Sequence, residues 1–312
     1  CYYAKKEGFE GVSTETGAGQ WGSAMAYASA LNQLRCHIFW VKAAYDWKPG
    51  RRAMMKLYGA EVHPSPSPLT ETGRSILKKE PDHPGSLGIA VSEGLEYVGT
   101  KEGYAYSLGS VMNHVLMHQT VIGLETMKQF ELVDDEPDVL IGCFGGGSNF
   151  GGFSLPFMRE VLAGKRECSF LASQSEAAPN IAKGEYRYDF ADHAGKTPLL
   201  KMYTLGHDAE MQPIRGEGLR YSGAAPIMSL LRHLGYIDAR TYPIDEMAVF
   251  GAARLFAQTE GFIPAPESAY AIRAMIDEAV RYKELGEEKT LACNISGHGF
   301  LDMGGYRKAL NL

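Results

Sequence analysis

The sequence lacks several features that would place it in a specialised class of protein. It has no uninterrupted apolar run of about 18 residues, so no segment predicts a membrane span. It has no excess of positive charge, because 31 Lys and Arg residues are set against 37 Asp and Glu residues, giving a formal net charge of −6. Nucleic acids and anionic membranes attract basic surfaces, so we expect neither of them as a partner.

Cysteine is scarce and shows no paired spacing. The sequence contains no C-x-x-C, and its five cysteines are widely separated: Cys1, Cys36, Cys143, Cys168 and Cys293. An odd count without metal-ligand spacing predicts free thiols in a reducing compartment, with neither a disulfide framework nor a zinc site. No signal peptide is visible, so we expect a cytoplasmic location.

The chain also lacks an initiator Met and starts CYYAKKEGFEG. Tyr2 to Glu7 have the pattern of the last turns of a helix that Gly8 ends. A domain rarely begins in the middle of a helix. We therefore expect that a segment upstream of this sequence is missing.

What the sequence does contain is an alternation of apolar β-type runs with amphipathic helical runs. Strands are predicted at 36–41, 60–66, 139–144, 169–174, 236–243 and 290–296. Helices are predicted at 51–59, 85–98, 111–130, 224–235, 245–258 and 267–283. This alternation predicts an α/β fold with mostly parallel sheets and helices on both faces, and the length suits two domains. The acidic stretch VDDEPD (133–138) is the best candidate for a loop near the domain boundary.

A glycine-rich turn follows the apolar run in VLIGCFGGGSNFGG (139–152). A Walker A loop is excluded because Phe153 stands where Lys is required, and a dinucleotide fingerprint is excluded because Phe150 stands at its last small position. What remains is a loop whose N–H groups can close on an anion, with the Ser148 hydroxyl nearby and Asn149 as a helix cap. A purely structural turn is the alternative, but the position after a buried strand favours a phosphate loop.

A second glycine turn lies in STETGAGQWG (13–22), after a short strand that we expect to end at Thr14. A helix is predicted from about Trp21, so backbone amides again crowd a helix start, which suits a carboxylate as well as a phosphate. Glu15 is a candidate acid–base group, because partial burial raises a carboxyl pKa toward neutrality. The alternative is a Glu15 that sits in a solvated turn.

Three further positions are candidates with weaker signals. Ser296 ends a predicted strand before a Gly-His-Gly turn and can hydrogen-bond a ring nitrogen, or it is a simple turn serine. Glu267 lies in a first helical turn after two prolines, where it is either a site residue or an acid that stabilises the helix dipole. His114 and His118 have the i, i+4 spacing of a metal pair, but no third ligand is evident, which favours structural or polar-core histidines and leaves any metal unknown.

Taken together, ETGAGQWG, GGGSN, PAPESAYAI and NISGHG, in this order, resemble the β subunit of tryptophan synthase. Trp21 and the run YSLGSVMNHVLMHQTVIGLE resemble the divergent second type of that β chain. The resemblance covers nearly the whole sequence. It implies fold type II of the enzymes that depend on pyridoxal 5′-phosphate (PLP), with two three-layer α/β domains. Residues 1–118 would be a partial N-terminal domain with the mobile substrate-loop subdomain, and 119–312 the domain that binds the PLP phosphate.

The activity that the resemblance implies is a β-replacement by a carbon–oxygen lyase, in which L-serine and indole give L-tryptophan and water. Glu15 would be the acid–base catalyst. The implied cofactor-binding residues are Gly145, Gly146, Gly147, Ser148, Asn149, Glu267 and Ser296. The residues implied to hold the amino-acid carboxylate are Thr16, Gly17, Ala18, Gly19 and Gln20. The family also implies a homodimer and a monovalent cation held by backbone carbonyls, and Trp21, where the main branch has His, implies weak coupling to an α subunit.

One departure from the family concerns the lysine that carries PLP. That lysine belongs to a His-Lys-Asn type motif upstream of ETGAGQ, and no such motif occurs in this sequence. Lys5 and Lys6 are expected to face solvent and are not given its role, so we expect a fragment without the Schiff-base lysine. The alternatives are a serine or threonine deaminase, a non-catalytic PLP- or amino-acid-binding protein, and a nucleotide-binding α/β protein, which the failed phosphate-loop patterns weaken.

Overall fold

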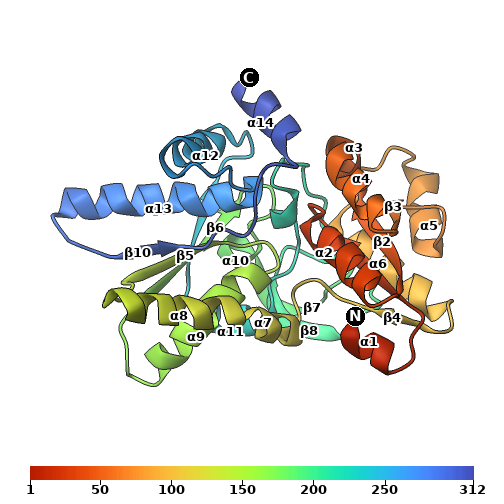
Figure 1. Ribbon diagram of the computed structural model, residues 1–312, viewed down its shortest axis with the longest axis horizontal. Helices are drawn as coiled ribbons and strands as arrows, with labels where there is room; N and C mark the ends of the chain where they lie inside the picture. The colour runs from red at the N-terminus through yellow and green to blue at the C-terminus, as the bar shows by residue number, and fades with distance from the viewer.

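The computed structural model describes residues 1–312 and places them in two α/β units, each built on a four-stranded sheet (Figure 1). The first sheet has the order β3-β2-β1-β4 and contains β1 (Gly11–Thr16), β2 (Arg35–Val41), β3 (Glu61–Ser65) and β4 (Tyr104–Tyr106). The second has the order β10-β5-β6-β9 and contains β5 (Val139–Cys143), β6 (Ser169–Ser175), β9 (Asp238–Tyr242) and β10 (Leu291–Cys293).

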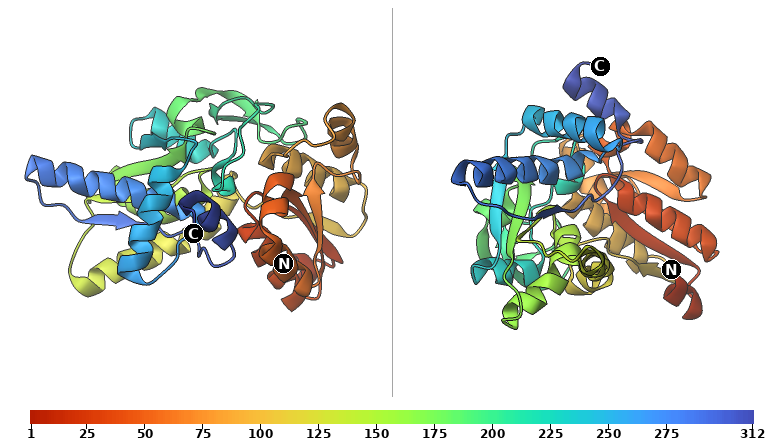
Figure 2. Two further views of the ribbon diagram at one scale, coloured as in Figure 1. Left: turned by 90° about the horizontal axis from the view of Figure 1, so that it is seen from above. Right: turned by 60° about the vertical axis from the view of Figure 1, so that its left-hand side comes forward.

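All neighbouring strands in both four-stranded sheets are parallel. The one antiparallel pair is the hairpin of β7 (Glu185–Phe190) and β8 (Leu199–Thr204). Seen from above, the N-terminal unit stands to one side of the remainder of the chain (Figure 2). The predicted α/β class with mostly parallel sheets is therefore confirmed.

Helices cover both faces of the first sheet. Its helices are α1 (Tyr2–Lys6), α2 (Gln20–Leu31), α3 (Lys42–Trp47), α4 (Pro49–Leu57), α5 (Glu71–Lys79) and α6 (Leu87–Gly99). Gly22 of α2 lies against Thr16 and Ile38, whereas Gly94 of α6 lies against Ser13. Because successive residues of a strand face opposite sides, α2 and α6 pack on opposite faces. The predicted helix at 51–59 corresponds to α4, after which Gly59 adopts φ +85°.

The second sheet is covered in the same way. Around it lie α7 (Asn113–Gln119), α8 (Val121–Val133), α9 (Ser148–Leu162), α10 (Asn180–Lys183), α11 (Pro226–His233), α12 (Met247–Glu260), α13 (Pro266–Leu285) and α14 (Met303–Leu310), with a short 3-10 helix η1 (Glu217–Leu219). Leu140 of β5 belongs to the apolar cluster that includes Phe150 of α9. Its neighbour Ile141 belongs to the cluster of Tyr270 on α13. Apolar contacts therefore fill both faces of this sheet.

The predicted continuous helix at 111–130 is wrong in one respect, because the structure breaks it at Thr120 into α7 and α8. Both helices pack on α9, and Gly123 of α8 lies directly against the Phe153 carbonyl and the Pro156 ring. Tertiary packing therefore overrides a periodicity that allowed one helix. The domain division at residues 118 and 119 stays a prediction, and VDDEPD forms the connection between α8 and β5.

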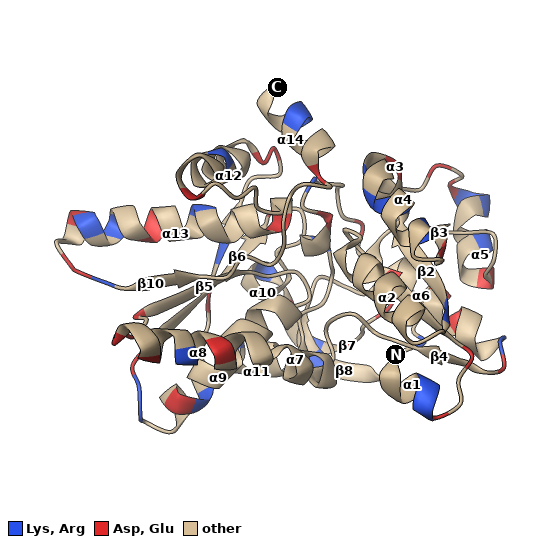
Figure 3. Cartoon of the chain, in the orientation of Figure 1, with Lys and Arg blue, Asp and Glu red and all other residues tan.

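The molecule carries acidic and basic side chains side by side on its outer helices, as α13 shows clearly in Figure 3. None of the helices combines the length and the apolar character needed to cross a membrane. The five cysteines all carry free thiols, as the sequence predicts.

Candidate active site

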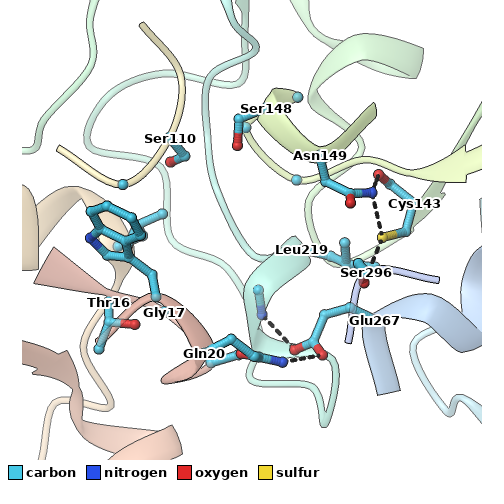
Figure 4. Close-up of a pocket in the computed structure, with 18 of the residues that line it drawn as sticks. Thr16, Gly17, Gln20, Ser110, Cys143, Ser148, Asn149, Leu219, Glu267 and Ser296 are labelled. Carbon is cyan, nitrogen blue, oxygen red and sulfur yellow. Dashed lines mark hydrogen bonds between the residues drawn. The ribbon is translucent and has the colours of Figure 1, made fainter. Parts of the chain in front are cut away.

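A cavity that is partly open to solvent lies between the two units, where β1 and β5 end. It is bounded by the two glycine turns and by residues from the segments around Gly109, Gly218 and Ser296 (Figure 4). Ligands of open parallel sheets bind outside the carboxyl ends of the strands. The topology therefore directs both predicted turns to one place, and they do line the same cavity.

Both turns place a glycine in the left-handed conformation directly before a helix. Gly19 precedes α2 with φ 99° and ψ −8°, and Gly147 precedes α9 with φ 99° and ψ −4°. L-residues rarely adopt such left-handed angles. Space is also absent, since a Cβ on Gly19 would lie 2.6 Å from the Trp40 ring and one on Gly147 would lie 2.7 Å from the Phe144 ring.

The GGGSN loop offers a row of free donors. The N–H groups of residues 145–149 donate to no acceptor within the protein, although buried N–H groups are nearly always paired. Several of these N–H groups belong to the start of α9, whose dipole favours a negative charge. The loop therefore fits a phosphate group, with the Ser148 hydroxyl also lining the cavity.

The predicted helix cap at Asn149 is wrong. Helix α9 begins at Ser148 with Gly147 as its cap, and the Asn149 amide instead donates to the Cys143 carbonyl at 3.3 Å. A glycine that already satisfies the turn leaves no need for a side-chain cap. Asn149 thereby ties the loop back to the end of β5, as Figure 4 shows.

The ETGAGQ loop offers free donors as well. The N–H groups of residues 17–20 donate to no acceptor within the protein. Two of its side chains are already engaged, because Thr16 Oγ1 accepts from the Gly22 N–H at 3.1 Å and Gln20 Nε2 donates to Glu267 Oε2 at 3.0 Å. The main chain, more than the side chains, is thus free to hold a carboxylate.

Glu15 is buried, with 1% of its surface exposed, so the solvated-turn alternative is wrong. It is the penultimate residue of β1, which runs to Thr16 and not to Thr14 as predicted. One carboxylate oxygen accepts from the Gly109 N–H at 2.7 Å and the other from the Tyr106 hydroxyl. Burial outweighs these hydrogen bonds and raises the pKa of Glu15 to about 7. The group can therefore both take up and release a proton near neutrality.

Glu267 and Ser296 lie at the opposite wall of the cavity. Glu267 accepts from Gln20 and from the Gly218 N–H at 3.0 Å, so it joins the two units and is more than a surface helix-dipole acid. Ser296 Oγ lies 2.7 Å from Ser268 Oγ and 3.6 Å from Cys143 Sγ. Burial raises the pKa of Cys143 to about 12, so the thiol beside Ser296 stays uncharged. The neutral Ser296 hydroxyl fits an uncharged ring nitrogen.

Several residues of the site were not found from the sequence. Tyr106 and Gly109, which hold Glu15, lie more than 90 positions away from it, and no local pattern connects them. Gly218 and Leu219 belong to the short helix η1, whose sequence carries no recognisable motif. Cys143 carried a usable signal, because it directly precedes the glycine loop at the end of a buried strand.

The histidine pair does not line the cavity. His114 and His118 are both exposed on α7, so the polar-core interpretation is also wrong. The structure instead brings together three possible metal ligands, His37, Glu61 and His63, on β2 and β3 of the first sheet. No lysine is among the 19 residues that line the cavity, and Lys5 and Lys6 are exposed on α1 as expected.

Comparison with known proteins agrees with this geometry. The family model described as "Pyridoxal-phosphate dependent enzyme" matches residues 1–297. The chain is 53% identical to tryptophan synthase beta chain 2 of Methanothermobacter thermautotrophicus, over 98% of this chain and 71% of that protein. It is 54% identical to tryptophan synthase beta chain 2 of Aquifex aeolicus, over 100% of this chain and 72% of that protein.

Two solved structures share the fold at low sequence identity. One is a threonine deaminase from T.th., with a TM-score of 0.65 and 20% identity over 95% of this chain and 81% of that one. The other is an L-serine ammonia-lyase from Rhizomucor miehei, with a TM-score of 0.66 and 15% identity over 99% of this chain and 85% of that one. Family model, sequence relatives and fold agree, and the chain belongs to the pyridoxal-phosphate dependent enzymes and, within them, to the tryptophan synthase beta chains.

Proposed function

We propose that this chain forms the PLP-dependent site that joins L-serine and indole into L-tryptophan with loss of water. The observation that carries the proposal is that one cavity combines a loop of free N–H groups with a buried carboxyl whose pKa is about 7. The first suits the phosphate of the cofactor, and the second suits acid–base chemistry near neutral pH. The high identity to tryptophan synthase beta chains supports the choice of substrates.

The residues of the second unit would hold the cofactor. The N–H groups of the GGGSN loop, residues 145–149, would bind the phosphate together with the Ser148 hydroxyl. Ser296 would hydrogen-bond the ring nitrogen and Glu267 would line the same wall. PLP supplies an electron sink for the amino acid when it is bound. A neutral serine partner does not protonate the ring, which favours loss of the β substituent over other outcomes.

The residues of the first unit would act on the amino acid. The free N–H groups of residues 17–20 would hold its carboxylate. Glu15 would deliver a proton to the departing hydroxyl of serine and then accept one as indole is added. Tyr106 and Gly109 fix both carboxylate oxygens of Glu15, so the proton is exchanged at a defined position. Trp21, whose Nε1 donates to Thr14 Oγ1 at 2.6 Å, closes this side of the cavity.

We further propose a homodimer in a reducing, cytoplasmic setting. Apolar side chains that are about half exposed or more gather on α7 and α8, namely Met117, Val121, Ile122 and Leu124. Exposed apolar clusters of this kind commonly mark an interface. Five free thiols support the reducing compartment. A weak association with an α subunit is proposed from the resemblance alone.

The test is a PLP titration of the folded chain, followed by absorption spectroscopy with and without L-serine. We expect saturable binding and a spectral change that depends on L-serine, neither of which requires an internal lysine. Binding of PLP without any response to L-serine would favour a non-catalytic binding protein. A folded chain that binds no PLP would contradict the cofactor assignment.

A second stage adds indole and measures L-tryptophan in the holoenzyme. We expect Glu15→Gln to lower turnover by about 10²–10⁴-fold while PLP affinity stays within about twofold of the unchanged chain, as for loss of a general acid–base group. Release of pyruvate and ammonia from L-serine, with indole left unused, would favour the deaminase alternative. Unchanged turnover in Glu15→Gln would remove Glu15 from the mechanism.

A further inference from the structure

One buried carboxamide lies behind the GGGSN loop and joins it to a second segment of the cavity wall. Asn180, at the start of α10, has no exposed surface. Its Nδ2 donates to the carbonyl oxygens of Gly145 at 2.9 Å, Tyr221 at 2.9 Å and Gly223 at 3.0 Å. Gly145 begins the phosphate loop, and the other two carbonyls follow η1, which forms part of the cavity wall.

The orientation of this amide is fixed by its partners. Asn180 Oδ1 accepts from Gln174 Nε2 at 2.7 Å and from the Ile181 N–H at 2.6 Å. A backbone N–H can only donate and a backbone carbonyl can only accept, so the nitrogen must face the three carbonyls. Gln174 is itself buried and held by the Ala182 N–H at 3.1 Å, which locks the arrangement further.

Three carbonyl oxygens around one centre form a strongly electronegative cage. An amide nitrogen has two hydrogens, so three acceptors within 3.0 Å exceed what it can fully satisfy. Converging carbonyl dipoles are also the arrangement that replaces the hydration shell of a monovalent cation. The oxygen distances equal those of hydrogen bonds from an ammonium ion. The family resemblance leads one to expect a monovalent cation held by such carbonyls, yet at this cage the centre is already filled by protein.

We propose that the Asn180 side chain takes the place of a monovalent cation in this carbonyl cage and so positions the phosphate loop without an ion. The partial positive charge of the amide N–H groups offsets the three carbonyl dipoles. Because Gly145 is one of the three, the cage sets where the loop begins. Asn180 is thus a positioning residue for the anion site, and this role rests on the proposed function of the loop.

The first test compares PLP affinity in chloride salts of tetramethylammonium, sodium, potassium and ammonium at equal ionic strength. For the unchanged chain we expect dissociation constants that agree within about twofold, because the cage needs no ion. A tenfold or greater improvement in potassium or ammonium over tetramethylammonium would overturn the proposal.

The second test removes the carboxamide with Asn180→Ala. This change leaves three carbonyls around a space that a small cation can enter, whereas tetramethylammonium cannot. We expect PLP affinity to fall about tenfold or more in tetramethylammonium and to recover most of that loss in potassium or ammonium. Equal affinity in all salts, at the level of the unchanged chain, would show that Asn180 does not position the loop.

A matched control is Asn32→Ala, since Asn32 also donates from Nδ2 to a backbone carbonyl, that of Ala28, but lies at the end of α2 outside the cavity. It should show no dependence on the cation. If Asn180→Ala does not fold in tetramethylammonium, folding in potassium or ammonium alone supports the proposal. If it folds in no salt, Asn180→Ser takes its place, because serine keeps a single donor. The PLP affinity of Asn180→Ser in tetramethylammonium should then be lower than that of the unchanged chain and should improve in potassium or ammonium.

A readout without PLP separates this inference from the proposed function. In thermal melting of the chain alone, the melting temperature of Asn180→Ala should be about 2–4 °C higher in potassium or ammonium than in tetramethylammonium, because a bound ion stabilises the folded state. The melting temperature of the unchanged chain should differ by less than about 1 °C. If PLP binds in no salt but this melting pattern holds, the cofactor assignment fails and the cage inference stands. If the unchanged chain gains as much as the variant, the inference fails.

Discussion

The turns that follow β1 and β5 have nearly the same backbone and very different surroundings. Both place a left-handed glycine before a helix and leave a row of free N–H groups facing one cavity. The strand before the first turn carries a buried acid, Glu15, and the strand before the second carries a neutral thiol, Cys143. The backbone thus offers two rows of free donors, and only the first has beside it a carboxyl with a pKa near neutrality.

The two sheets differ in the same sense. Both faces of β5 are packed with apolar clusters. On the first sheet, by contrast, the face toward α6 buries the polar groups Ser13 and Glu15 on β1 and Glu93 on α6. Burial raises the pKa of Glu93 as it does that of Glu15. Both units bury further carboxyls, such as Glu217 and Glu246 in the second, so the difference lies at the strand ends: β1 presents the titratable Glu15 there, whereas β5 presents the uncharged thiol of Cys143.

The strongest test of whether the two turns bind different ligands is to add one methyl group at each turn. Gly147→Ala and Gly19→Ala should each lower the free energy of unfolding by roughly 2–4 kcal/mol, because both combine a positive φ with a Cβ clash. We expect Gly147→Ala to weaken PLP binding about 100-fold and Gly19→Ala to weaken it less than about threefold, as measured by titration. Equal losses of PLP affinity would show that the turns do not divide the ligands between them.

Gly251→Ala is a matched control for this pair. Gly251 lies within α12, and a Cβ there would meet no atom within 4 Å. Because Ala favours a helix over Gly, this variant should be as stable as the unchanged chain or up to about 1 kcal/mol more stable. Its PLP affinity should not change.

A second prediction uses pH to separate the units. The pKa of Glu15 rises from 4.5 to about 7 on folding, so the folded state binds more protons than the unfolded state between these values. Stability from this group is therefore present below pH 4.5 and falls as pH rises to about 7. Glu15→Gln removes the group that becomes charged when buried. Its effect on the free energy of unfolding should therefore be about 1–3 kcal/mol more favourable at pH 8 than at pH 5.

Denaturant titrations at both pH values measure this difference. Glu160→Gln is a control, because that carboxyl is partly exposed and the hydrogen bond from Arg159 lowers its pKa. It should not reproduce the gain at high pH. An effect of Glu15→Gln that is the same at pH 5 and at pH 8 would contradict a Glu15 carboxyl whose pKa is raised on folding.

A third prediction concerns the hydrogen bond that joins the units across the cavity. Gln20→Ala removes the donor to Glu267 Oε2 and leaves that oxygen with one partner fewer. We expect a loss of about 1–3 kcal/mol in the free energy of unfolding, because the bond involves a carboxylate. Gln33→Ala, at an exposed position after α2, should cost less than about 0.5 kcal/mol. Equal effects of the two variants would mean that the bond across the cavity contributes nothing.

The smallest expected effect is at Ser296. Ser296→Ala would remove the proposed neutral hydrogen bond to the ring nitrogen, which is worth about 0.5–1.5 kcal/mol, so PLP affinity should fall roughly 2–10-fold. The folded structure should tolerate the change, since Ser268 keeps its hydrogen bond from the main chain of residue 296. A loss of 100-fold or more would indicate a charged partner at the ring, and no loss at all would remove Ser296 from the cofactor contacts.

Much of this arrangement is predictable from local sequence. The alternation of strands and helices gives the fold class, and the glycine turns predict two helix starts with free backbone donors, because backbone geometry depends on nearby residues. The partners of Glu15 are not predictable in this way, since Tyr106 and Gly109 reach it only through the parallel pairing of β1 with β4 and the loop beyond. Asn180 is hidden for the same reason, because its three carbonyls come from distant segments.

The misplaced cap at Asn149 and the undivided helix at 111–130 share a cause. Each local pattern allowed the expected structure, but a glycine already made the turn in the first case and packing on α9 set the break in the second. Local propensity states which structures are allowed, and tertiary contacts choose among them.

The free N–H groups at the two turns also shape how this site can change by mutation. A donor that belongs to the main chain is present whatever side chain the residue carries, except proline. No ordinary substitution at residues 145–147 can therefore delete a donor, and every one of them adds atoms to a crowded loop. Substitutions at residues 145–147 can therefore harm the loop only by adding bulk, and not by removing a hydrogen-bond donor. The donors of the loop are retained as long as its glycines are retained.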